Sequence, residues 1–170
     1  MIMMATSKRK NLPKLPGSRC IGCGSENPLG LNMSFYCVGK TVRSDVTLSE
    51  HHMGWENLAH GGMISTILDE IMGWTVLAFR RVFFVTRSIE VHYLRPVRVN
   101  VPLTAVGEIE TDFAPKGCST RGSLLDAEGT KLAEGRAEMV YLSEKRLPLL
   151  PEQYRKEMLA LFEQMRQLLD

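Results

Sequence analysis

Two neighbouring carboxylates, Asp69 and Glu70, interrupt an otherwise apolar stretch at residues 63–79. This stretch predicts one helix that is apolar on nearly every side, and such a helix is normally surrounded by protein. A carboxylate in that setting is costly unless it has partners. The sequence therefore places an ionisable group where packing alone would favour leucine. Such a group can act as a general base or as a nucleophile toward a carbonyl carbon.

Two glycines, Gly61 and Gly62, stand at the start of this helix, where open backbone N–H groups favour negative charge. Gly62 and Asp69 are seven residues apart, so they share a helix face but lie roughly 10 Å apart along the axis. One reacting carbonyl cannot contact both, because each must approach it to about 3 Å. We therefore expect two copies of the helix to run antiparallel about a two-fold axis, which gives two interfacial sites per dimer.

Asp69 is preferred over Glu70 as the reacting group, because Glu70 lies ~100° further round the helix from Gly62. Ser65 and Thr66 are one turn before Asp69, and we expect them to hydrogen-bond its carboxylate and hold it ionised. Asp69 as a purely structural acid is the competing interpretation.

Composition bounds the protein class. The chain has 170 residues, 44% hydrophobic and 24% charged, which is typical of one globular domain. A net charge of +2 gives no electrostatic reason to expect nucleic acid or membrane as a partner. No secretion signal is visible, so we expect a cytoplasmic protein. Residues 1–19 carry five basic residues and no acidic one, and are expected to form a flexible tail.

Cys20 and Cys23 have the C-x2-C spacing that is common among zinc ligands. No second pair of this kind completes the site, although His51 and His52 could do so. We favour a packed loop with reduced thiols, and therefore expect no metal.

The remaining pattern predicts strands at residues 31–37, 41–48, 86–99, 103–109, 118–126 and 131–142. In the third, Ile89, Val91 and Tyr93 share one face, and Ser88, Glu90 and His92 share the other. After Pro151, an apolar stripe predicts a final helix. We expect an α+β fold in which an antiparallel curved sheet of five to six strands wraps one long central helix.

The motif His60-Gly61-Gly62, with Asp69 nine residues after His60, resembles the hotdog-fold acyl-CoA thioesterases of the PaaI-like, phenylacetate-degradation type. The Cys20-x-x-Cys23-Gly segment and the Tyr93-Leu94-Arg95-Pro96 segment are also similar to that family. The resemblance covers residues 20–142, and we assign the domain to residues 20–147. Residues 148–170 would form a C-terminal amphipathic helix packed on this domain or on a neighbour.

The resemblance implies hydrolysis of an acyl-CoA thioester, with Asp69 as general base or nucleophile. It implies that the Gly62 N–H polarises the carbonyl, that His60 fixes the start of the helix, and that Asn57 positions water or the carbonyl. It further implies no metal or redox cofactor, because coenzyme A is part of the substrate. As partners we expect a second copy of the chain, in a homodimer with interfacial active sites that pairs into a dimer of dimers. We assign four further residues to substrate binding: Gly61, Ser65, Thr66 and Ser88.

Two other functions fit the same fold. One is a non-catalytic acyl-CoA binder or sensor, which would lack thiol release. The other is an enoyl-CoA hydratase, which needs an Asp and a His placed together at the start of the helix.

Overall fold

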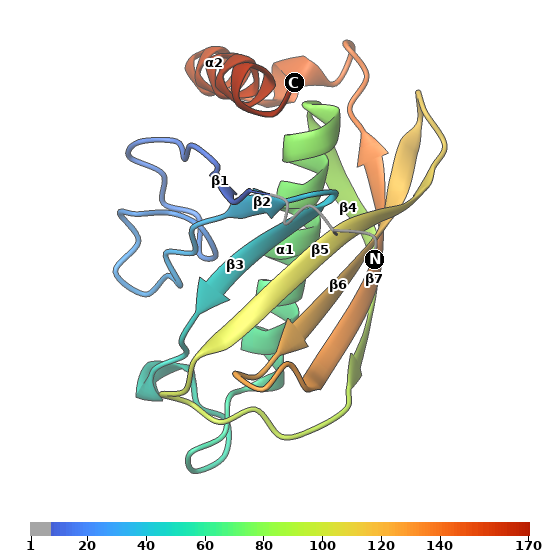
Figure 1. The fold of residues 1–170 in the computed structure, drawn as a ribbon. Helices are drawn as coiled ribbons and strands as arrows, with labels where there is room; N and C mark the ends of the chain where they lie inside the picture. Colours follow the sequence, from blue (N-terminus) through green and yellow to red (C-terminus); the bar gives the residue numbers. More distant parts are fainter. Residues whose placement is uncertain (1–7) are drawn as a thin grey trace.

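The structure is a computed structural model that describes residues 8–170. One long helix, α1, lies in the curve of a single antiparallel sheet, and a second helix, α2, crosses near the C-terminal end of α1 (Figure 1). The sheet has seven strands in the order β1-β2-β3-β5-β6-β7-β4. The elements are β1 (Lys10–Asn11), β2 (Tyr36–Val38), β3 (Thr41–Val46), α1 (Gly61–Arg80), β4 (Phe84–Tyr93), β5 (Leu103–Asp112), β6 (Gly117–Leu125), β7 (Lys131–Tyr141) and α2 (Glu152–Leu169).

The predicted hotdog fold is confirmed, with one strand more than expected. The expected strand at residues 31–37 is largely wrong, since only Tyr36–Val38 pairs as β2. Met33 and Phe35 are buried as their alternation predicted, but the Met33 N–H donates to the carbonyl of Gly22 and not to a strand. The backbone of residues 31–33 is therefore held by hydrogen bonds to the loop at residues 21–22 and not by a neighbouring strand.

The expected flexible tail differs from the structure in its second half. Residues 1–7 lie outside the described residues. Further on, Lys10–Asn11 form strand β1 against β2, and the side chain of Leu12 is buried in the core. The burial of Leu12 and the pairing of Lys10–Asn11 with the edge strand β2 together hold this segment in place.

A row of three glycines lets α1 approach the sheet closely. Gly107 on β5 pairs with Gly122 on β6, which pairs in turn with Gly135 on β7. A methyl group at Gly107 would overlap Thr75 Oγ1 and lie 2.8 Å from the carbonyl oxygen of Ile71, both on α1. The row therefore sets the distance between the helix and the sheet.

Strand β4 is an edge of the sheet, paired with β7 on one side only. It ends at Tyr93 and not at residue 99, because the chain turns away before Pro96. Ile89, Val91 and Tyr93 share one face, as predicted, and their register opposite buried β7 positions shows that this face is the one toward α1. A β-bulge at Arg87 adds one residue on β4 and changes the alternation N-terminal to it.

Helix α2 is held by one apolar stripe, as its spacing predicted. Its buried residues are Met158, Leu161, Phe162 and Met165. The rings of Phe162 and Phe83 meet edge to face with centroids 5.5 Å apart. Helix α1 is long and apolar enough to cross a membrane by length and composition alone, but it packs against the sheet as a core helix does.

Candidate functional site

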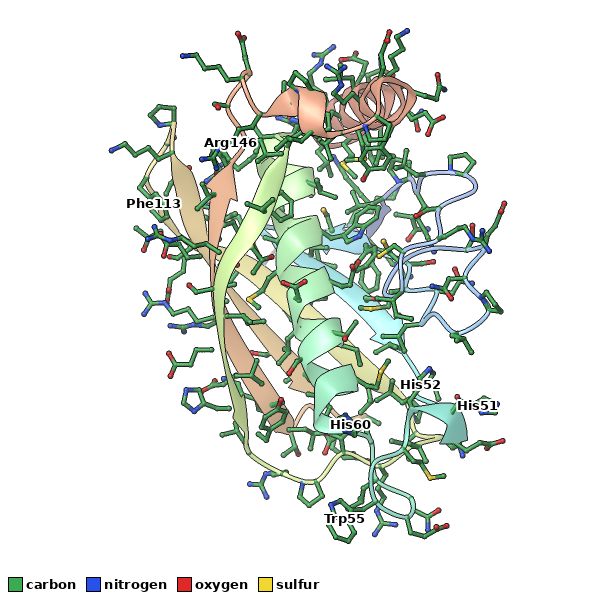
Figure 2. All side chains as sticks on the ribbon, turned by 180° about the vertical axis from the view of Figure 1, so that it is seen from behind. His51, His52, Trp55, His60, Phe113 and Arg146 are labelled. Atoms are coloured by element: carbon green, nitrogen blue, oxygen red, sulfur yellow. The ribbon has the colours of Figure 1, made fainter. Side chains whose placement is uncertain are left out.

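The first turn of α1 is capped by His60. Its Nδ1 accepts a hydrogen bond from the Gly62 N–H at 2.9 Å (Figure 2 shows His60 at the start of the helix). The Gly62 N–H therefore already has an acceptor, contrary to the open donor that we expected there. The Gly61 N–H has no acceptor within residues 8–170. The free donor in this turn thus belongs to Gly61.

A tyrosine from β4 covers the same turn. Tyr93 Oη lies 2.7 Å from Ser65 Oγ and donates to the carbonyl of Gly61 at 3.2 Å. Thr66 Oγ1 donates to the carbonyl of Gly62 at 2.9 Å. The expectation that Ser65 and Thr66 would hold the Asp69 carboxylate is therefore wrong, because the Ser65 hydroxyl bonds to Tyr93 on β4 and the Thr66 hydroxyl donates to the Gly62 carbonyl.

Asp69 is held instead from β4. Thr86 Oγ1 donates to Asp69 Oδ1 at 2.9 Å. The carboxylate is half-buried, and it forms no ion pair with any of residues 8–170. Because it is oriented by a neutral hydroxyl and not by a cation, its second oxygen remains available to a ligand or a water molecule.

The bulge on β4 is what brings Thr86 to Asp69. Simple alternation gives Thr86 the same face as Ser88, whereas the extra residue at Arg87 moves Thr86 to the face of Ile89, toward α1. Ser88 pairs with Glu138 on the opposite, outer face. The assignment of Ser88 to the substrate side of the sheet is thus not supported, and Thr86 occupies that place.

A cavity of about 280 Å³ opens beside Asp69. Its walls come from α1, the start of β4, the loop before β2, and α2, and they are mainly apolar. The lining residues are Lys14, Leu15, Ser18, Cys20, Cys23, Asp69, Glu70, Gly73, Trp74, Leu77, Phe83, Phe84, Val85, Thr86, Leu142, Leu150, Tyr154, Met158 and Leu161. An apolar space of this size next to one oriented carboxylate suits an acyl chain or ring.

Glu70, passed over in the sequence, lines the same cavity beside two cysteines. Glu70 Oε1 lies 3.1 Å from Cys20 Sγ. Burial raises the pKa of Glu70 to about 8. A hydrogen bond between the two thiols lowers the pKa of Cys20 and raises the pKa of Cys23. The Glu70 carboxylate thus contacts Cys20, whereas the hydrogen-bond partner of the Asp69 carboxylate is Thr86.

Asn57 has a structural place in the turn before α1. Its backbone adopts a left-handed conformation with φ of 61°, and its carbonyl accepts from the Val99 N–H at 3.2 Å. Its exposed side chain makes no hydrogen bond with residues 8–170. The structure therefore brings together Gly61, Gly62, His60 and Ser65 at one end of α1, and Asp69 with Thr86 further along the helix.

About a third of the chain matches a known protein family. Residues 56–111, which include His60, both glycines and Asp69, match the family model described as the thioesterase superfamily. No curated protein matches the chain.

Solved structures share the fold. A thioesterase superfamily protein is 24% identical with a TM-score of 0.66, and the alignment covers 72% of this chain but only 60% of that chain. The E. coli PaaI protein from the phenylacetic acid degradation operon is 13% identical with a TM-score of 0.60, covering 66% of this chain and 81% of that one. A hypothetical thioesterase from Streptococcus pneumoniae, solved with coenzyme A, is 21% identical with a TM-score of 0.57, covering 61% and 82%. The likeness of the fold to PaaI and to other thioesterase structures is confirmed.

Proposed function

We propose that this chain, whose central helix lies within a thioesterase-superfamily segment, hydrolyses an acyl-CoA thioester to a free acid and coenzyme A. The observation that carries the proposal is the Asp69 carboxylate, which faces an apolar cavity and is oriented by Thr86 without an ion pair. The structural neighbour solved with coenzyme A supports the same class of substrate.

Asp69 would act on the thioester carbonyl in one of two ways. As a general base it takes a proton from water, the water oxygen attacks the carbonyl carbon, and the carbon–sulfur bond breaks to release coenzyme A. As a nucleophile its oxygen attacks first, coenzyme A leaves, and water then cleaves the resulting anhydride. A positioned base contributes ~10²–10⁴ in rate. Every step uses groups of the protein and water.

The oxyanion needs a donor that the same α1 cannot supply. Gly61 is eight residues before Asp69, so the two lie roughly 12 Å apart along the helix. We therefore propose that the Gly61 N–H of one copy polarises the carbonyl that Asp69 of the other copy attacks. One such donor is worth ~3–4 kcal/mol. This proposal moves the donor from Gly62 to Gly61, because His60 already accepts from Gly62.

Strand β4 offers the surface for this pairing. It is a ten-residue edge strand with exposed apolar side chains at Val85 and Tyr93, and such an edge readily pairs with another strand. On β4, Thr86 contacts Asp69 and Tyr93 contacts Gly61. We propose that two β4 strands pair in antiparallel orientation, with Thr86 opposite Tyr93 of the partner subunit. The two-fold axis then passes midway between these two positions, near Ile89 and Glu90.

The activity test is thiol release from a panel of aryl, short-, medium- and long-chain acyl-CoAs. We expect turnover of at least one class, and a loss of ~10²–10⁴ in Asp69→Asn, with the oligomeric state unchanged in sedimentation. Near-normal rates in Asp69→Asn would defeat the assignment. Tight acyl-CoA binding without thiol release would favour a non-catalytic binder of the same fold.

The two-fold axis is tested separately by cysteine cross-linking. A residue on the axis faces its own copy, so Glu90→Cys should form an intermolecular disulfide under mild oxidation. Glu108→Cys, an exposed position on β5, is the matched control and should stay monomeric on a non-reducing gel. Equal cross-linking of both variants would contradict the β4 pairing. The same sedimentation experiment tests the predicted dimer of dimers.

A further inference from the structure

Three metal-ligating side chains converge where the loop before β2 meets the middle of α1. The sulfur atoms of Cys20 and Cys23 and a carboxylate oxygen of Glu70 all lie within 4.8 Å of one another. Ligand atoms around a tetrahedral zinc ion at ~2.3 Å lie roughly 3.5–4 Å apart. The three side chains thus need only small rotations to reach a common centre. Neither His51 nor His52 joins this group among residues 8–170.

The loop that carries Cys20 and Cys23 leaves space for the Glu70 side chain to approach their sulfur atoms. Gly22 lies between the two cysteines, and a methyl group there would overlap the Glu70 side chain. The carbonyl of Gly22 accepts from the Met33 N–H at 3.0 Å, and the carbonyl of Ile21 accepts from the Leu31 N–H at 2.8 Å. The backbone thus fixes the turn in place, while the missing side chain leaves room for the carboxylate.

Cysteine binds a metal as the thiolate, and a cation at this place would hold both sulfurs in that form. Cys20 Sγ donates a hydrogen bond to Glu70 Oε1 at 3.1 Å, and both cysteines line the cavity together with Glu70. A partly buried carboxylate that has thiols as its partners is otherwise hard to explain, whereas a cation between the three groups would compensate all of them.

We propose that Cys20, Cys23 and Glu70 form a Zn²⁺ site whose fourth coordination position faces the cavity. Two thiolates select a soft or borderline metal, and three protein ligands of type S, S and O with one open position match zinc. All three residues line the cavity, so water or a small ligand can complete the tetrahedron. The site revises the expectation of no metal, because its third ligand comes from α1 and not from a second cysteine pair.

The site is a separate feature from the proposed hydrolysis. Asp69 and Glu70 are adjacent in sequence, yet Asp69 bonds to Thr86 and Glu70 approaches Cys20. The metal would fasten the loop before β2 to α1. Metal binding is measured without substrate, so failure of this proposal and failure of the hydrolase proposal are distinguishable.

The test uses the full chain, stripped with a chelator and reduced under anaerobic conditions. We expect elemental analysis to find one zinc ion per chain after Zn²⁺ is added back, and Co²⁺ to give the thiolate charge-transfer bands and intense visible bands of a tetrahedral sulfur site. Glu70→Gln should bind at least ~10-fold more weakly, since even changes outside the coordination sphere cost ~10–100-fold. Cys23→Ser should lose part of the charge-transfer intensity.

Two variants serve as matched controls. Glu26→Gln removes an exposed carboxylate from the same loop, and Cys37→Ala removes a buried thiol elsewhere. Both should bind Zn²⁺ as the unmodified chain does. The Co²⁺ spectrum of the unmodified chain needs no variant to fold. Absence of the charge-transfer bands, or a Cys20–Cys23 disulfide in the anaerobic protein, would overturn the proposal. Unchanged affinity in Glu70→Gln would remove Glu70 from the ligand set and overturn it as stated.

Discussion

Replacing the three glycines of the row under α1 by alanine one at a time should destabilise the protein in a graded order. At Gly107 the new methyl group overlaps Thr75 Oγ1 and lies 2.8 Å from the backbone of α1 at Ile71. Thr75 is fully buried, and its hydroxyl already donates to the Ile71 carbonyl at 2.7 Å. The helix must therefore move or lose this bond. Overpacking of this kind costs ~1–3 kcal/mol, occasionally more.

The other two positions are milder because a methyl group there stays at least 3.1 Å from every neighbouring atom. A methyl group at Gly122 meets Met72 Cγ at 3.1 Å, and one at Gly135 meets Met72 Cε at 3.4 Å, an ordinary contact. None of the three glycines has a positive φ. Alanine at Gly135 should therefore be neutral, or stabilising by up to ~1 kcal/mol because it restricts the unfolded chain.

Thermal unfolding followed by circular dichroism, at one fixed protein concentration, measures the order. For a chain of this length, ~2–4 °C per kcal/mol predicts a loss of ~2–12 °C for Gly107→Ala. Gly122→Ala should lose less, and Gly135→Ala should lie between no change and a gain of ~4 °C. An unchanged midpoint for Gly107→Ala, or a larger loss for Gly135→Ala, would refute the idea that the row sets the helix-to-sheet distance.

Three further predictions concern the site and the cysteines. Thr86→Val keeps the side-chain volume but removes the hydrogen bond to Asp69, which should lower kcat/KM for acyl-CoA by ~10-fold or more, since a bond to a charged group is worth ~1.5–3 kcal/mol; an unchanged rate would show that Thr86 does not orient the carboxylate. Zn²⁺ at 100 times its Kd should stabilise the reduced chain by ~2.7 kcal/mol, and a chelator should remove this gain, as differential scanning fluorimetry measures; an equal midpoint with and without the ion would count against the metal site. Cys37 and Cys118 should resist a thiol reagent at pH 8 until the protein unfolds, because burial raises the pKa of the Cys37 thiol to about 11 and also raises the pKa of the Cys118 thiol. Mass spectrometry of the labelled chain, with and without denaturant, measures this protection. Rapid labelling of either residue in the folded chain would contradict the burial.

Most of the fold could be predicted from the spacing of apolar residues, because most of its helices and strands have the spacing typical of their type. The apolar run at residues 63–79 became α1, and the alternation in residues 103–109 and 131–142 became β5 and β7. Residues 31–35 also alternate, but the N–H groups of Leu31 and Met33 donate to loop carbonyls, and no periodicity encodes such contacts. Strand β1 is too short to give a pattern, and it exists because β2 leaves an edge to pair with.

The site was only partly readable, for two physical reasons. The bulge at Arg87 reverses the faces of β4 before Ser88, so alternation selected Ser88 where the structure uses Thr86. The contact between Cys20 and Glu70 joins residues fifty positions apart, and only the missing side chain of Gly22 hints that something approaches the turn closely. The helix motif itself was visible because its spacing lies within one element, although the capping of Gly62 by His60 was not foreseen.

The cavity walls come from segments that are far apart in the sequence, and this affects how related proteins could come to prefer different substrates. Leu15 lies before β2, and Tyr154 and Met158 lie on α2, so these two segments enclose the space while α1 contributes the carboxylate. Substitutions at these terminal positions alter the shape of the space without changing the reacting group. In the proposed hydrolase, selectivity for the acyl group can therefore change through the segment before β2 and through α2, while Asp69 on α1 stays in place.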